Sequence, residues 1–167
     1  MSRVPNPRLH APDCRAALET QSARLFAERA TRAQKTELRR LARSLDALFA
    51  HMATRGNDAA FRFRVHGRHV QFHMRIAQHA GSRLLKDMID RNHVLILNWL
   101  FDIAGRRTPL PPRFHSQLAE MLVSGDADKA DTAMRAHVSY GFREISGQIG
   151  ALSASHWRER TVIRKRN

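Results

Sequence analysis

The sequence is poor in cysteine and lacks long apolar runs, and each shortage excludes a class of protein. Among 167 residues there is one cysteine, Cys14, so no disulfide can form within the chain, and a lone thiol fits a reducing compartment. No run approaches the roughly 18 apolar residues that cross a bilayer, and residues 1–10 contain no apolar signal-peptide core. We therefore predict a cytoplasmic protein without a membrane partner.

Positive charge is what the chain has in excess. Lys+Arg number 29 against 15 Asp+Glu, which gives a formal net charge of +14 at pH 7. Such a field attracts anions from small carboxylates to nucleic acids, and a basic surface that simply faces water explains it equally well. No helix-turn-helix or zinc-finger pattern accompanies the charge, and few aromatic residues lie between the basic ones. Direct nucleic-acid binding therefore ranks last among three functional hypotheses.

Apolar residues recur at intervals of three and four along most of the chain, which predicts helices and no strand. Helix caps and breakers divide this pattern into six segments. They run from Pro12 to about Ala30, from Thr31 to Gly56, from Asp58 to Ala80, from Ser82 to near Gly105, from Pro112 to Gly125, and from Asp126 into a long last helix. Gly67 is a point where the third helix can bend or split.

Length and composition fit one domain. With 43% hydrophobic residues the chain has enough apolar material for a single core. Short loops between helices favour an antiparallel, up-and-down bundle, so the predicted fold class is all-α with about six helices. We expect an N-terminal linker over residues 1–11, the helical bundle over 12–155 and a basic tail over 156–167.

Four of the ten histidines lie on apolar faces of predicted helices. His69 and His73 are four residues apart and project from one face, and His115 and His137 lie on the apolar stripes of the fifth and sixth helices. A single buried histidine is more often satisfied by a hydrogen bond, but one metal ion would satisfy all four together. All-nitrogen ligation favours Zn or Ni, with Fe, Co or Cu as further options, over Ca or Mg. His66 is the best-placed spare ligand.

Three stretches carry motifs in a characteristic order: R-x-x-L-E near the start, F-H-x-x-I-x-x-x-A-G in the middle, and two histidines that flank G-D. The stretches are RAALETQSARLFAERAT (15–31), HVQFHMRIAQHAGSRLL (69–85) and FHSQLAEMLVSGDADKADTAMRAHV (114–138). Over about residues 12–150 the sequence resembles the FCD domain, the C-terminal effector-binding domain of FadR-type GntR transcription regulators.

The resemblance implies an antiparallel helical bundle, usually dimeric, whose central cavity holds a metal and a small organic acid. The metal positions of the family fall on His69, His73, His115 and His137, the four that spacing also selects. His69 stands where the family usually has aspartate, which shifts the metal preference toward nitrogen-loving ions or leaves three ligands.

Two further positions are carried over from the family. Arg15, in the R-x-x-L-E motif, matches an arginine that in relatives can point into the cavity, where its guanidinium would clamp a carboxylate. A salt bridge to Glu19 is an equally good interpretation. Ser82, a second predicted ligand-binding residue, stands where the family usually has asparagine, a departure that is expected to change a cavity hydrogen bond while preserving the helix cap.

The leading hypothesis is the effector-binding and dimerisation domain of a transcription regulator, in which an organic acid binds the metal. GntR regulators carry a winged-helix DNA-binding domain, which the residues before the first helix are too few to form. DNA contact is therefore expected only through an attached domain. The alternative is a free-standing metal-dependent enzyme that acts on a small carboxylate. For that role Asp87, Asp90 and Glu120 form no obvious catalytic set with the histidines.

Overall fold

The computed structural model describes residues 11–54, 58–91, 110–141 and 143. Over these ranges the chain forms α1 (Ala11–Arg29), α2 (Arg32–Thr54), α3 (Ala59–His79), a helical segment over 83–91, α5 (Phe114–Val123) and a helical segment over 127–141. No strand occurs among the described residues, so the predicted all-α fold is confirmed. The rest of the predicted fourth helix and the tail over 156–167 lie outside the described residues.

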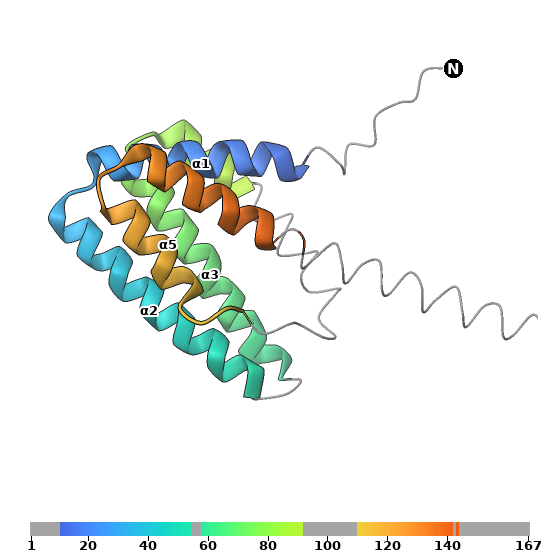
Figure 1. Cartoon of the computed structure of the whole chain (residues 1–167). Helices are drawn as coiled ribbons and strands as arrows, with labels where there is room; N and C mark the ends of the chain where they lie inside the picture. Colours follow the sequence, from blue (N-terminus) through green and yellow to red (C-terminus); the bar gives the residue numbers. More distant parts are fainter. Residues whose placement is uncertain (1–10, 55–57, 92–109, 142, 144–167) are drawn as a thin grey trace, which may run out of the picture.

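Helices α2, α3 and α5 form the body of the bundle. Figure 1 shows them side by side, with α2 and α3 antiparallel, and shows α1 inclined across them beside segment 127–141, drawn in orange. Both α1 and α2 pack against α3 and α5. An ion pair of 2.6 Å between Arg24 Nη1 and Asp128 Oδ1 joins α1 to segment 127–141. Within the described ranges, no helix has the length and hydropathy that a bilayer crossing requires.

Polar side chains start several helices where the sequence predicts them. Thr31 Oγ1 accepts a hydrogen bond of 3.3 Å from Gln34 N, while Gln34 Oε1 accepts one of 2.8 Å from Thr31 N, which is a reciprocal capping box before α2. Asp58 caps α3 through Phe61 N, and Asp126 Oδ1 caps segment 127–141 through the amides of residues 128 and 129. These caps satisfy backbone donors that have no partner within the helix.

Two local expectations need correction. Helix α3 runs through Gly67 as one α-helix, so the chain does not split there. Helix α5 begins at Phe114 and not at Pro112, because Phe114 N bonds to Pro111 O in a turn and Arg113 adopts the left-handed conformation, with φ of 58°.

The hydrophobic core draws on every long described helix. Its largest side chains that are almost fully buried are Phe26, Leu38, Leu45, Phe72, Ile76, Leu122 and Met134. On α2 the buried residues recur at spacings of three and four, as the apolar stripe predicts. On α1, by contrast, the buried face also carries three polar residues, Glu19, Thr20 and Ser22, which are 2%, 3% and 1% exposed.

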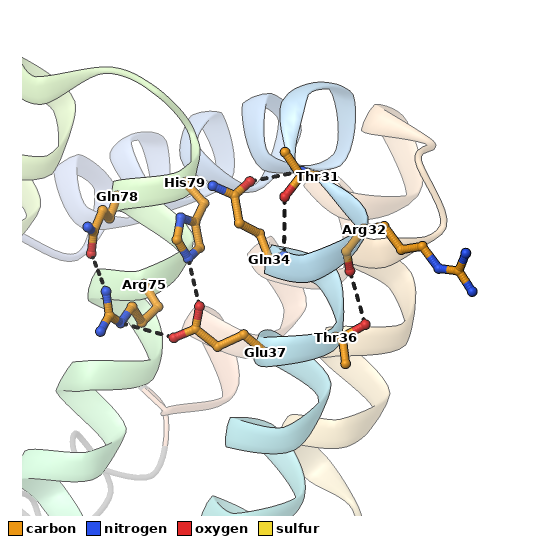
Figure 2. Close-up of polar contacts among 8 residues, drawn as sticks. All are labelled: Thr31, Arg32, Gln34, Thr36, Glu37, Arg75, Gln78 and His79. Atoms are coloured by element: carbon orange, nitrogen blue, oxygen red, sulfur yellow. Dashed lines mark hydrogen bonds and ion pairs between the residues drawn. The ribbon is translucent and has the colours of Figure 1, made fainter.

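A polar junction ties the start of α2 to the end of α3. Figure 2 shows the Glu37 carboxylate between His79 and Arg75, with Nε2 of His79 at 3.2 Å and Nε of Arg75 at 3.3 Å. Arg75 also donates to Gln78 Oε1 at 2.7 Å. This junction holds α2 and α3 together at the end of the pair where α1 joins α2.

Candidate metal centre

Three elements bring the four predicted histidines to one place. His69 and His73 project from α3, His115 from α5, and His137 from segment 127–141. The ligand atoms of His69, His115 and His137 all lie within 4.8 Å of one another, a spacing that could hold a metal ion. The His73 ring centroid lies 4.7 Å from that of His69 and 5.1 Å from that of His137. Imidazoles distant in sequence therefore converge in the interior.

The distances between the imidazole nitrogens in this cluster fit a metal ion shared by the rings better than a hydrogen bond between two of them. His73 Nε2 lies 3.0 Å from His69 Nε2 and 3.2 Å from His137 Nε2. A ring nitrogen carries either one proton or one lone pair, so a single proton cannot satisfy three converging nitrogens. Nitrogens bound to one ion at about 2.0–2.1 Å lie roughly 2.9–3.4 Å apart, and both distances fall in that range.

The cluster is largely shielded from water, and burial keeps two of its imidazoles, those of His69 and His137, neutral. His73, His115 and His137 are 2%, 0% and 6% exposed, whereas His69 retains intermediate exposure. Burial, followed by the nearby histidines and Arg15, holds the pKa of His69 well below its usual range. Burial likewise lowers the pKa of His137, reinforced by His73 and His115 and opposed by Glu19. Neutral imidazole is the form that binds a metal.

Phenylalanine rings form the walls of the cluster. Phe114 stacks on His137 with ring centroids 4.4 Å apart, and Phe49 stacks on His115 at 5.1 Å. Phe49 also meets His69 edge-on at 5.8 Å. These contacts fix the planes of the imidazoles and exclude water from their faces, which lowers the local dielectric constant around any bound ion.

Two carboxylates lie behind the histidines, and neither was predicted from the sequence to have this role. Glu19 Oε2 of α1 contacts His73 Nδ1, and Asp46 Oδ1 of α2 lies 2.8 Å from His115 Nδ1. Burial alone would raise the pKa of Asp46, but hydrogen bonds from His115 and Ser116 outweigh it and the pKa is lowered, so the group is a carboxylate. In the sequence, a carboxylate on the core-facing side of a helix was the feature that could have identified both residues.

This feature appears in the spacing of the two carboxylates from buried apolar residues on the same helices. Asp46 follows the buried Ala42 by four residues and the buried Leu38 by eight. Glu19 precedes the buried Ala23 by four residues. Both therefore lie on core-facing stripes, where an acidic residue requires a buried partner.

Arg15 and Ser82, the two residues predicted to bind an effector, lie in different places. Arg15 Nε is 2.5 Å from Glu19 Oε1, so the salt bridge considered for it is present, and through Glu19 it reaches His73. Ser82 precedes segment 83–91, where its Oγ accepts a hydrogen bond of 3.4 Å from Leu85 N and caps the helix. Arg15 therefore lies close to the histidines. The contact of Ser82 in the structure is the helix cap.

Other residues considered in the sequence lie apart from the centre or beside it. His66 is buried one turn before His69, with its ring edge-on to Phe49 at a centroid distance of 6.2 Å. Glu120 is on the surface of α5, where both carboxylate oxygens accept hydrogen bonds from Arg39 of α2. That pair with Arg39 lowers the pKa of Glu120.

The fold and the site together define an all-helical domain with a buried histidine cluster. A family model described as FCD domain matches residues 12–140, which is well over half of the chain. The chain belongs to the FCD domain family, and so to the effector-binding domains of GntR-family transcription regulators. FCD domains often bind metal, and the histidine cluster could hold one. A comparison with curated proteins gave no match.

Proposed function

We propose that this domain binds one divalent transition metal, with zinc or nickel as the best fits, and uses it to capture a small organic acid. His69, His73, His115 and His137 would hold the ion. The observation that carries the proposal is the convergence of three Nε2 atoms at 3.0 and 3.2 Å in a cluster where burial lowers the pKa of His69 and of His137. A nitrogen-only donor set favours these metals over calcium or magnesium.

The ion would supply a Lewis-acidic point of attachment for a carboxylate. Four neutral imidazoles leave its double positive charge in place, which attracts an anionic effector. His69 keeps partial exposure, which marks the side from which an effector atom would approach. The field of Arg15 reaches His69 and His137, so its guanidinium is close enough to favour a second negative group.

Effector binding would act on a regulator through the position of the helices. We propose a homodimer in which the acid shifts the packing of the bundle and so changes DNA binding by an attached winged-helix domain. A ligand can shift such an equilibrium only through its different affinity for the two states, so reversible binding without turnover is the expected behaviour.

Thermal unfolding with and without zinc, in the presence of a panel of mono- and dicarboxylates, tests the proposal. We expect zinc to raise the melting temperature and at least one acid to raise it further only when zinc is present. Arg15→Gln should reduce the acid-dependent rise at saturating zinc. Arg24→Gln, which removes a surface arginine from the same helix, should leave it unchanged. The absence of a zinc-dependent rise, or of any acid-dependent one, would contradict the proposal.

A further inference from the structure

The two imidazole–carboxylate contacts lie on the outer side of the histidine cluster. His73 meets Glu19 through Nδ1, while its Nε2 faces His69 and His137. His115 meets Asp46 through Nδ1, and its buried Nε2 has no hydrogen-bond partner among the residues that the structure describes. A carboxylate only accepts, so in both rings the proton belongs on Nδ1 and the lone pair on Nε2. That tautomer presents Nε2 to a metal.

We infer that Glu19 and Asp46 are positioning residues of the metal centre, which fix the tautomers of His73 and His115 and supply the negative charge that four neutral imidazoles lack. This inference rests on the metal binding proposed above. A doubly charged ion held by neutral rings keeps its full charge in a medium of low dielectric constant, which is costly. Two carboxylates one ring away offset that double charge, and Arg15, which pairs with Glu19, leaves one positive charge at the centre to attract an anionic effector.

The two carboxylates are anchored differently. Asp46 accepts four hydrogen bonds, from the backbone amides of His115 and Ser116, from His115 Nδ1 and from Ser116 Oγ, at distances from 2.6 to 3.0 Å. It thereby caps the first turn of α5, where Arg113 gives no side-chain cap. Glu19 shares its charge between His73 and Arg15. Loss of the Asp46 charge should therefore weaken metal binding more than loss of the Glu19 charge.

Metal affinity would then depend on helices that supply no ligand. Glu19 lies on α1 and acts on a histidine of α3, and Asp46 lies on α2 and acts on a histidine of α5. Through these two contacts, an ion held by α3, α5 and segment 127–141 is connected to α1 and α2 as well. If Glu19 and Asp46 served only in packing, the metal affinity would not depend on the charge of either carboxylate.

Zinc affinity, measured by competition with a chromophoric chelator, tests the inference in the full chain. Glu19→Gln and Asp46→Asn should each raise the zinc dissociation constant about 10- to 100-fold. Matched controls are Glu37→Gln, which alters a histidine–glutamate contact outside the centre, and Asp126→Asn, which alters a helix cap outside the centre. Both controls should stay within about threefold of the wild type, since neither touches a proposed ligand.

Imidazole nitrogen chemical shifts of the metal-free wild-type protein give a second measurement, which needs no variant to fold. His73 and His115 should each carry the proton on Nδ1. The inference is overturned if either ring carries it on Nε2, or if both carboxylate variants bind zinc as tightly as the controls. Failure of the wild type to bind zinc would contradict the proposed function instead, and the tautomers would still decide the positioning role.

Discussion

His73 contacts two other histidines of the cluster and one of the carboxylates behind it. Its Nδ1 contacts Glu19, and its Nε2 is approached by the Nε2 atoms of His69 and His137. With the proton on Nδ1, a single lone pair faces two ring nitrogens, so at most one of these close contacts is a hydrogen bond at any time. An ion relieves this conflict because it accepts a lone pair from every ring at once.

Acid should destabilise the metal-free protein. Burial, then neighbouring histidines and Arg15, lower the pKa of His69, and burial does the same for His137, from an ordinary value of 6.5. Below pH 6.5 the unfolded chain therefore binds protons that the folded one does not, and stability falls as the pH falls toward the lowered values. Urea unfolding midpoints between pH 7.5 and 5.5, with a chelator present, should decline.

The double variant His69→Asn, His137→Asn separates this effect from the titration of carboxylates. Its unfolding midpoint should decline less over the same pH range, because the two depressed groups are gone. A wild-type midpoint that is constant or higher at pH 5.5 would show that the buried rings do not resist protonation.

The sequence predicted the histidine cluster better than the carboxylates that lie behind it. Spacing and apolar faces selected His69, His73, His115 and His137, and the structure brings these four together, although metal binding by them stays a prediction. Glu19 and Asp46 were missed because a carboxylate on a helix usually faces water. Their contacts with the histidines depend on which helices pack together, and periodicity alone does not give that information.

Two glycines, one in a helix and one in the left-handed conformation, should respond in opposite directions to substitution by alanine. Gly67 lies within α3 with open space where a side chain would be, so Gly67→Ala should raise the free energy of unfolding by about 0.5–1 kcal/mol. Gly125 has a φ of +86°, in the left-handed region, so Gly125→Ala should lower it by about 1–2 kcal/mol. Urea denaturation of both variants checks the signs, and equal effects would contradict the assigned conformations.

Helix boundaries were predicted well where a side chain makes the cap and poorly where the backbone does. Thr31, Asp58 and Asp126 mark the starts of their helices, because the capping oxygen is visible in the sequence. The start of α5 was misplaced by two residues, since Pro112 suits a first turn but the chain turns at Arg113 first. The cap of α5 comes from Asp46 on another helix, which no local pattern contains.

At the scale of the whole molecule, metal binding and stability should be linked. An ion that binds the folded but not the unfolded chain should stabilise it by about 1.4 kcal/mol for each tenfold increase in free metal above the dissociation constant. Melting temperature should therefore rise steadily with the logarithm of the zinc concentration. Magnesium, which prefers oxygen ligands, should produce no rise, and a similar response to both ions would point to nonspecific binding.

The all-α class and the family followed from the sequence, whereas the arrangement of the helices did not. Apolar periodicity identifies which face of a helix is buried, but it does not identify the helix that covers it. The contact between His73 and His137 joins residues that are 64 apart in the chain. It exists only because α3 and segment 127–141 both border the same interior.

The polar inner face of α1 also bears on how long the molecule survives in a cell. Glu19, Thr20 and Ser22 place polar groups on the buried face of this helix, so this half of α1 gains little from leaving water. Its attachment depends on directional contacts, chiefly those of Glu19 with His73 and Arg15, and local opening costs least in such a region. We expect proteases to attack this helix first when the ion is scarce, so that metal supply would govern the turnover of the protein.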